Sequence, residues 1–181
     1  VSRDYIEKRI QSGDVMYGVN TGFGAFANVR ISDAEIELLQ RNLIQSHSVG
    51  IGTPFSIRET RAMMVLRANT LAKGHSGIRP ILVDQILDFL NHDLIPVIPS
   101  QGSVGASGDL APLSHLALAL IGEGEVWNEQ GAIVSAKDAI QEKKMQPLVL
   151  KAKEGLALIN GCQVMTAIGL LGLFDLSRLL Q

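Results

Sequence analysis

The stretch from Glu154 to the end of the chain is almost entirely apolar, and it limits the possible folds more than any other part of the sequence. A membrane span is one interpretation of an apolar run of this length. Polar residues, among them Asn160, Gln163, Asp175 and Arg178, interrupt the run. They favour instead one long helix, from Glu154 to Leu180, buried inside a bundle. Such a helix needs a large partner surface, so we expect this chain to require further helices, from the same protein or from a partner, to cover it.

Two segments carry the sequence pattern of a helix N-terminus, in which a serine is followed three residues later by glutamate. Ser32–Glu35 precedes apolar residues at helical spacing, so we expect a capping box there and a helix from Ile36, with His47 in its last turn. Ser56–Glu59 precedes a second helix, which we expect to end at Gly74. Both segments therefore predict helices in the first half of the chain.

The middle of the chain predicts two more helices, one from Pro80 to about Leu90 and one from Leu113 to Ile121. Between them, residues 94–99 predict an extended segment. Residues 126–134 predict a small β-hairpin, and Ser135 begins a short charged helix. The expected fold is therefore mainly α, with a small β-hairpin and long loops between the helices.

The composition excludes several classes of function. The 16 basic and 18 acidic residues nearly balance and form no basic stripe, so we expect no nucleic-acid partner. The four histidines lack the spacing of metal ligands, so we expect no metal. The single cysteine, Cys162, excludes an internal disulfide and fits a reducing compartment. Because the start of the sequence also lacks a signal-segment pattern, we expect a cytoplasmic protein that does not bind membranes.

The triplet Ala106-Ser107-Gly108 lies in a glycine-rich segment and can in principle cyclise. The Gly108 amide nitrogen attacks the Ala106 carbonyl carbon with loss of water, and loss of the Ser107 hydroxyl as a second water leaves an exocyclic methylene. The product, methylidene-imidazolone, is an electrophile, which ordinary side chains do not provide. Gly108 suits the reaction because it has no Cβ to block the approach. Asp109 either orients the loop, assists the water losses or caps the following helix.

Other interpretations of this glycine-rich segment are open. A glycine loop before a helix can bind phosphate, but the dinucleotide-binding and P-loop patterns are both absent, which argues against a nucleotide cofactor. A nucleophile elbow needs a glycine at position 109, where this chain has Asp109. A plain turn is the simplest interpretation. The triplet alone therefore does not decide the function.

Four separated segments together resemble one family: 17–24 (YGVNTGFG), 42–47 (NLIQSH), 102–115 and 154–161 (EGLALING). Their order and spacing are similar to the N-terminal part of the histidine ammonia-lyases, in the aromatic amino acid ammonia-lyase family that carries methylidene-imidazolone. The likeness extends from about Tyr17 to the end of the chain. It implies elimination of ammonia from L-histidine to give trans-urocanate, with an electrophile that captures the amine and a base that removes the β-proton.

The resemblance assigns roles residue by residue. Tyr17 matches a tyrosine on a mobile loop over the site, often assigned as the general base, and its pKa near 10 would have to be lowered for that role. Ser46 and His47 match the histidine-specific form of a pair that usually includes a leucine in relatives acting on phenylalanine or tyrosine. An imidazole can exchange a hydrogen bond with a substrate imidazole. Asn160 matches an asparagine that contacts the cofactor ring or the substrate carboxylate.

Each of these residues also has a purely structural interpretation. A tyrosine can anchor a loop by its hydroxyl, a histidine can interact with the dipole at a helix C-terminus, and a buried asparagine can satisfy the backbone of a bundle. Two functional alternatives also remain. The first is a tyrosine or phenylalanine ammonia-lyase or an aminomutase with the same cofactor. The second is an inactive fragment that lacks C-terminal catalytic residues.

The resemblance also implies the organisation of the whole protein. Residues 1–150 would form an N-terminal active-site domain carrying the Ala-Ser-Gly loop, and residues 151–181 would begin a truncated central helical bundle. The full enzyme would be a larger helical bundle, assembled as a homotetramer, whose second half supplies a tyrosine, an arginine and a glutamate. Because Val1 is not an initiator methionine and the sequence stops within an apolar run, we expect this chain to be incomplete.

Overall fold

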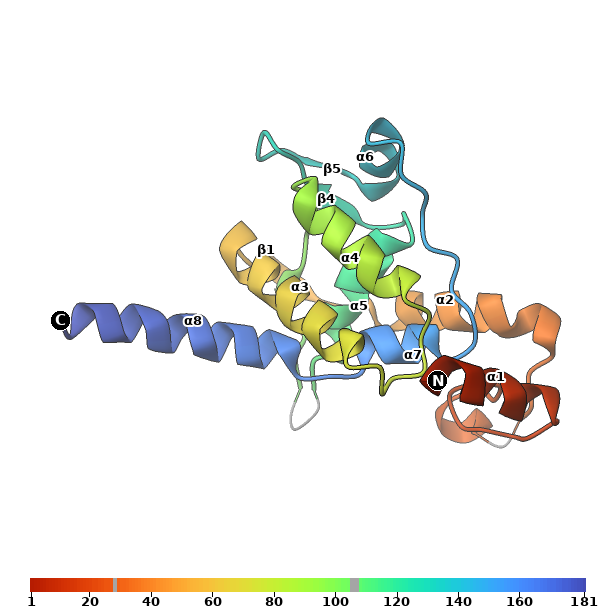
Figure 1. The fold of residues 1–181 in the computed structure, drawn as a ribbon. Helices are drawn as coiled ribbons and strands as arrows, with labels where there is room; N and C mark the ends of the chain where they lie inside the picture. Colours follow the sequence, from red (N-terminus) through yellow and green to blue (C-terminus); the bar gives the residue numbers. More distant parts are fainter. Residues whose placement is uncertain (28, 105–107) are drawn as a thin grey trace.

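A computed structural model describes residues 1–27, 29–104 and 108–181, and helices dominate it (Figure 1). The α-helices are α1 Ser2–Gln11, α2 Ile36–His47, α3 Ile57–Ala72, α4 Ile81–Asn91, α5 Leu110–Leu120, α6 Ala136–Glu142, α7 Glu154–Ile159 and α8 Gln163–Leu179. Two short 3₁₀ helices are η1 Gly24–Phe26 and η2 Asp33–Glu35. The expectation of a mainly α fold is confirmed.

Two small antiparallel sheets cover one side of the helices. Strand β1, Ile51–Pro54, pairs with β3, Pro99–Gln101. Strand β2, Ile95–Pro96, pairs with β4, Glu125–Trp127, which in turn pairs with β5, Ile133–Ser135. The β4–β5 hairpin was predicted. The extended segment 94–99 is also confirmed, but its pairing with strands far away in the sequence was not predicted.

One apolar core joins α2, α3, α4, α5 and α7. Its largest fully buried side chains include Phe89, Ile44, Met63, Met64, Leu82, Ile86, Leu113 and Leu116. Burying each side chain of this kind contributes roughly 1.5–3 kcal/mol. A smaller cluster of Val19, Ile36 and Ala152 attaches the N-terminal segment to this body, with side chains of α1 packed against it. The core thus fixes the helices whose ends carry the candidate site residues.

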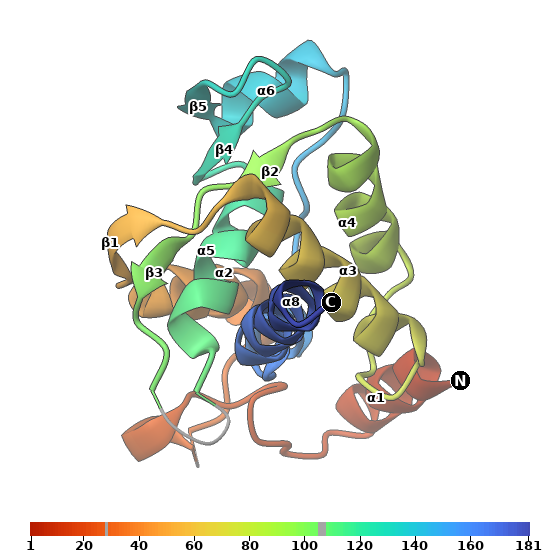
Figure 2. The ribbon, with the colours of Figure 1, turned by 90° about the vertical axis from the view of Figure 1, so that its left-hand side faces the viewer.

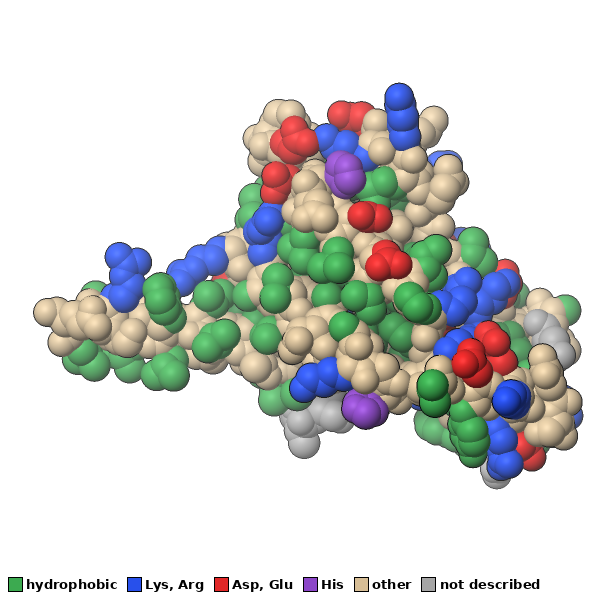
Figure 3. Space-filling view, in the orientation of Figure 1, with side chains coloured by type: hydrophobic (Ala, Val, Ile, Leu, Met, Phe, Trp, Pro, Cys, Tyr) green, Lys and Arg blue, Asp and Glu red, His purple; other side chains and the backbone are tan. Residues whose placement is uncertain are grey.

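Helix α8 leaves this body as a projecting arm (Figure 1), and Figure 2 looks almost along its axis. Its first turns are buried, through Gln163, Val164 and Ala167. Farther along, large apolar side chains are exposed, among them Leu170, Leu173, Phe174, Leu176 and Leu179. Apolar side chains are visible along the arm in Figure 3. In the part of the chain that the structure describes, none of the helices has the combination of length and apolarity needed to cross a bilayer.

The two predicted capping boxes have different outcomes. At Ser56, the hydroxyl accepts from the Glu59 amide while the Glu59 carboxylate accepts from the Ser56 amide, so the capping box of α3 is confirmed. At Ser32 the prediction is wrong. The Ser32 hydroxyl instead donates to the Glu35 carboxylate at 2.6 Å, and the chain makes one 3₁₀ turn, η2, before α2 begins. The predicted helix from Ile36 to His47 is nevertheless confirmed.

The prediction of one long helix from Glu154 to Leu180 is wrong. Helix α7 ends at Ile159, residues 160–162 are not helical, and α8 begins at Gln163. Asn160 is extended, with φ −87° and ψ 105°. Contacts from elsewhere in the fold hold this break open. It lies beside the ends of the glycine-rich segment, so the break is the starting point for the candidate site.

Candidate functional site

The break between α7 and α8 places Asn160 and Gly161 beside Gly108, the last residue of the Ala-Ser-Gly triplet. Gly161 forms an isolated parallel bridge with Gly108. The Gly108 carbonyl also accepts a hydrogen bond from the Val104 amide at 2.8 Å, so residues 104 and 108 lie close together. A close approach of these two ends is compatible with cyclisation of the triplet. Ala106 and Ser107, which would supply most of the electrophile, lie outside the described residues.

Asp109 connects the triplet to the start of α8. Its buried carboxylate accepts hydrogen bonds from the amides of Val164 (2.9 Å) and Met165 (3.0 Å) through one oxygen. The other oxygen accepts from the Ser103 hydroxyl at 2.7 Å. A carboxylate at a helix N-terminus satisfies free amides and interacts favourably with the helix dipole. Asp109 therefore caps α8, and makes no side-chain capping bond to α5, the helix that follows it.

Asn160 lies at the junction with its side chain exposed. Its amide nitrogen in the backbone donates to the Leu156 carbonyl at 3.0 Å, and its own carbonyl accepts from Arg67 at 3.1 Å. Within the described residues, the side-chain amide has no hydrogen-bond partner. The backbone of Asn160 is therefore fixed while its amide group is available to a ligand.

His47 is the last residue of α2 and is half-buried. Its Nδ1 lies 2.8 Å from the Leu43 carbonyl and 3.1 Å from the Ser46 hydroxyl. A contact with a carbonyl oxygen requires a proton on Nδ1, because the carbonyl only accepts. In a neutral imidazole this leaves Nε2 as an acceptor. The α2 C-terminus thus presents one ring nitrogen that can accept a hydrogen bond.

The segment after His47 lies against the start of the glycine-rich segment. The Gly50 amide donates to His115 Nε2 at 3.0 Å, and burial lowers the pKa of His115, which keeps the ring neutral. A Cβ on Gly102 would lie 3.2 Å from the Gly50 Cα and 3.2 Å from the Ala111 Cβ. Residue 102 therefore fits only without a side chain, and the chain beyond His47 contacts one end of the segment that holds the triplet.

Tyr17 is 59% exposed and lies on the N-terminal loop. Its ring packs edge-on against Phe23, with centroids 5.9 Å apart. The next residue, Gly18, lies so close to α7 that a Cβ would be 2.5 Å from a methyl carbon of Leu156. This contact places the loop of Tyr17 against the helix that ends at Asn160.

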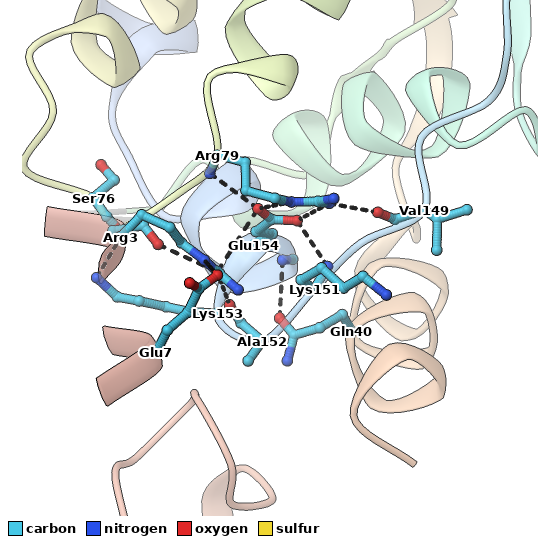
Figure 4. Close-up of polar contacts among 12 residues, drawn as sticks. Arg3, Glu7, Gln40, Ser76, Arg79, Val149, Lys151, Ala152, Lys153 and Glu154 are labelled. Carbon is cyan, nitrogen blue, oxygen red and sulfur yellow. Dashed lines mark hydrogen bonds and ion pairs between the residues drawn. The ribbon is translucent and has the colours of Figure 1, made fainter. Parts of the chain in front are cut away.

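A cluster of charges that sequence reasoning did not identify holds the other end of α7 (Figure 4). The carboxylate of Glu154, fully buried, accepts from the Arg79 Nε at 2.8 Å and from an Arg79 terminal nitrogen at 2.6 Å. The amides of Arg79 and Lys151 donate to the same carboxylate, and Arg3 lies 3.8 Å from it. Burial alone would raise the pKa of Glu154, but the Arg79 and backbone hydrogen bonds lower it below its usual value.

Sequence reasoning also missed Arg67, which is buried under Asn160 and Gly161. Its terminal nitrogens donate to the Asn160 carbonyl, the Ala157 carbonyl and the Gln163 side chain. One signal could have revealed it. Arg67 falls at helical spacing within the otherwise apolar face formed by Met63, Met64, Ala68 and Leu71, and a charge at such a position needs specific partners.

The whole chain, residues 1–181, matches the family model described as aromatic amino acid lyase. The chain belongs to the aromatic amino acid lyase family. Among curated relatives, it is 56% identical over 178 residues to histidine ammonia-lyase of Shouchella clausii (strain KSM-K16), covering 98% of this chain and 35% of the relative. The chain therefore spans about a third of the length of the curated relatives it matches.

Solved structures of other aromatic amino acid lyase family members share this fold. The structure of histidine ammonia-lyase from Trypanosoma cruzi matches with a TM-score of 0.84 and 43% identity, covering 93% of this chain and 32% of that one. The structure of tyrosine aminomutase from Streptomyces globisporus matches with a TM-score of 0.85 and 43% identity, covering 93% and 31%. Fold similarity alone therefore does not distinguish a lyase from an aminomutase.

In the ranges 1–27, 29–104 and 108–181, no three His, Cys, Asp or Glu side chains gather as a metal site would need. The groups that the structure does bring together are of another kind. They are Gly161, next to Asn160, with Gly108 at one end of the segment that contains the Ala-Ser-Gly triplet, and Gly50, three residues after His47, with Gly102 at its other end.

Proposed function

We propose that the protein carrying this chain is a histidine ammonia-lyase, which converts L-histidine to trans-urocanate and ammonia. The observation that carries the proposal is the Gly108–Gly161 bridge, because it joins the end of the triplet to the neighbour of Asn160. Identity of 54–56% to curated histidine ammonia-lyases over 98% of the chain supports the same reaction. The presence of both Ser46 and His47 supports histidine as the substrate.

The residues present fit a methylidene-imidazolone formed from Ala106-Ser107-Gly108. The hydrogen bond between residues 104 and 108 brings the flanks of the triplet together, and Gly108 offers an unhindered nitrogen. When formed, this group supplies an electrophile that takes up the substrate amine and makes it a better leaving group. Asp109 holds the end of the loop by its bonds to α8.

The chain's own residues would bind and orient the substrate. The Asn160 amide can donate to the substrate carboxylate or to a developing oxyanion. The His47 Nε2 can accept from the substrate imidazole N–H while Nδ1 stays bonded to Leu43. Tyr17, on its exposed loop, would remove the β-proton once the loop closes and excludes water.

We also propose that the complete enzyme is a cytoplasmic homotetramer, with residues 1–150 as its active-site domain and residues 151–181 as the start of the central bundle. The exposed apolar side chains of α8 support an assembly of helices, because isolated helices rarely leave such a surface in water. The exposed thiol of Cys162 fits a reducing compartment.

The first test is turnover by the protein made from its complete natural gene. Consumption of L-histidine, L-tyrosine and L-phenylalanine is compared, with release of ammonia to separate a lyase from an aminomutase and with Ser107→Ala as the control. We expect histidine to be the best substrate, and Ser107→Ala to lower kcat by at least about 10³-fold. Peptide mapping should show the loss of two water molecules from the triplet in the parent but not in Ser107→Ala. A variant with parental activity would contradict the proposed chemistry.

The second test concerns the substrate. In the double variant Ser46→His, His47→Leu, we expect kcat/KM for histidine to fall by about 10- to 100-fold, the scale of losing one buried hydrogen bond. The rival function is a tyrosine-specific lyase or aminomutase. It is supported by the 43% identity to tyrosine aminomutase from Streptomyces globisporus, which equals the identity to histidine ammonia-lyase from Trypanosoma cruzi. If histidine remains the best substrate of the double variant, the specificity role of this pair is wrong. If tyrosine is the best substrate of the parent, the rival function is correct.

A further inference from the structure

Arg67 is a buried cation beneath the candidate site. It projects from α3 and is 2% exposed. One terminal nitrogen donates to the Gln163 Oε1 at 2.7 Å. The other donates to the Asn160 carbonyl at 3.1 Å and to the Ala157 carbonyl. A single guanidinium thus binds both α7 and α8 at the point where the chain changes direction.

The partners of Arg67 are all neutral. Two other arginines of α3 lie at the surface and pair with carboxylates, Arg58 with Asp175 and Arg61 with Asp93. No carboxylate in the described part of the chain lies within ion-pair distance of Arg67. Burial lowers the pKa of Arg67 to about 10, so the side chain stays charged at neutral pH. The carbonyls at the C-terminal end of α7 carry partial negative charge and compensate part of this charge.

The guanidinium also explains why residue 161 is glycine. A Cβ on Gly161 would lie 2.4 Å from an Arg67 terminal nitrogen and 2.1 Å from the Gln163 Oε1. Gly161 in turn bridges to Gly108. Arg67 is therefore in direct contact with Asn160 and with Gly161, the residue that bridges to the triplet.

We propose that Arg67 is a positioning residue, which holds the Asn160 carbonyl and the Gly161 backbone so that the Asn160 amide meets the substrate or the electrophile. The inference rests on the ammonia-lyase function proposed above. It follows from the fork shape of the guanidinium, which reaches three acceptors in different directions, whereas a lysine ammonium is a single point. A displacement of about 1 Å at such a support can lower a rate by about 10²-fold.

The test compares Arg67→Lys and Arg67→Gln with Arg61→Gln, in the protein made from its complete natural gene. Arg61 is a matched control because it lies on the same helix but pairs at the surface. Four quantities are measured: the melting temperature, the fraction of chains that have lost two waters from the triplet, and kcat and KM for L-histidine. The kcat is divided by the fraction of modified chains, which separates positioning from formation of the electrophile.

We expect kcat per modified site to fall by about 10²-fold in Arg67→Gln, with KM changed less than about threefold. Arg67→Lys, which keeps the charge but not the fork, should recover about tenfold of that loss. Arg61→Gln should match the parent. A folded Arg67→Gln or Arg67→Lys with parental kcat per modified site would overturn the inference. So would a loss of activity that disappears after division by the modified fraction.

Arg67→Lys decides the question if Arg67→Gln does not fold, because it keeps a buried cation in the same place. The parent enzyme separates this inference from the proposed function. If the parent acts on tyrosine or phenylalanine rather than histidine, the specificity is wrong, and the same comparison of kcat is made with that substrate. If the parent acts on none of them, the proposed function fails and the inference fails with it.

Discussion

The two ends of α7 each hold a buried charge, and they compensate it in different ways. At the N-terminal end, the Glu154 carboxylate has the Arg79 cation, a second cation nearby in Arg3, and two backbone amides (Figure 4). At the C-terminal end, Arg67 has only carbonyls and a side-chain amide. The Arg67 Nε, also buried, has no hydrogen-bond partner in the described residues.

We interpret the Glu154 end as an anchor of α7 in the fold, and the Arg67 end as a support of the candidate site. A buried charge that is fully paired contributes to holding one structure, whereas a partly compensated charge costs stability. Proteins accept such a cost mostly at functional positions. Helix α7 is therefore fixed at the end far from the triplet, and at the end next to Asn160 the incompletely compensated charge of Arg67 is consistent with a role in positioning.

The strongest test of this comparison removes the anchor. Glu154→Gln leaves Arg79 and Arg3 without their carboxylate, and breaking a buried pair in this way costs about 3–5 kcal/mol. Because the Arg79 side chain is 30% exposed, water screens part of the effect and we expect about 3 kcal/mol. The free energy of unfolding in urea measures it. The kcat of the molecules that remain folded should match the parent, unlike that of the Arg67 variants.

A surface pair is the control for this experiment. Glu129, which is exposed to solvent, pairs with Lys143, so Glu129→Gln should produce no resolvable change in the free energy of unfolding. A loss of less than about 1 kcal/mol in Glu154→Gln would contradict the anchor role, since a single ordinary hydrogen bond is worth about that much.

The second test adds one methyl group at each end of α7. In Gly155→Ala, the new Cβ would lie 2.9 Å from the Gln40 backbone carbonyl, which cannot move aside without moving α2. We expect a loss of about 1–3 kcal/mol of stability, with kcat unchanged. In Gly161→Ala, the Cβ meets the far ends of the Arg67 and Gln163 side chains instead. These can shift, so we expect a smaller loss of about 1 kcal/mol but a clear fall in kcat.

Urea unfolding and kcat on the same two samples give the result. The comparison of the two ends predicts opposite rankings, with Gly155→Ala the less stable variant and Gly161→Ala the less active one. Equal kcat in the two variants would show that the Asn160 end is no more sensitive to position than the anchor end.

Local pattern predicted most of the helices, because their ends are set by nearby residues. Residue spacing alone predicts the Ser56–Glu59 capping box and an α2 helix with His47 in its last turn, and the structure confirms both. The Ser32 hydroxyl bonds to the Glu35 side chain and caps no amide of η2, whereas the Ser56 hydroxyl makes the same bond to Glu59 and also accepts from the Glu59 amide. Helix boundaries of this kind shift by a residue or two between competing hydrogen bonds.

The break at Asn160 could not be predicted in this way. The residues that hold it are distant in sequence: Arg67 is 93 positions before Asn160, and Asp109 is 55 positions before Val164. The family resemblance identified Asn160 and the triplet, because it compares whole motifs. It assigned no role to Arg67. The role of Asp109 was left open among three possibilities, and its contacts with α8 appear only once the chain is folded.

The third prediction concerns pH, and it has the smallest expected effect. The Glu154 pKa is lowered in the folded chain, so the stability that this carboxylate contributes is present above its ordinary pKa of about 4.3 and is lost as pH falls through the folded value. Arg67 does not titrate in this range, so acid should weaken the anchor end and spare the other. The stabilising contribution of His115 is also lost in acid, so its effect on stability must be separated from that of Glu154.

Burial lowers the pKa of His115, whose Nε2 accepts from the Gly50 amide only while the ring is neutral. Its contribution is therefore complete above about pH 6.5, the unfolded pKa, and decreases as pH falls from there towards the folded value.

In His115→Gln the amide oxygen can still accept from Gly50, so at pH 8 stability should change by at most about 1 kcal/mol. Measured by urea unfolding from pH 8 to pH 3, the loss just below pH 6.5 should shrink, and the loss near pH 4 and below should remain. The control is His75→Gln, at an exposed histidine, which should keep both losses. If the drop in unfolding free energy just below pH 6.5 persists in His115→Gln while the drop near pH 4 disappears, the acid sensitivity does not come from the Glu154 anchor. The contrast between the two ends of α7 then fails.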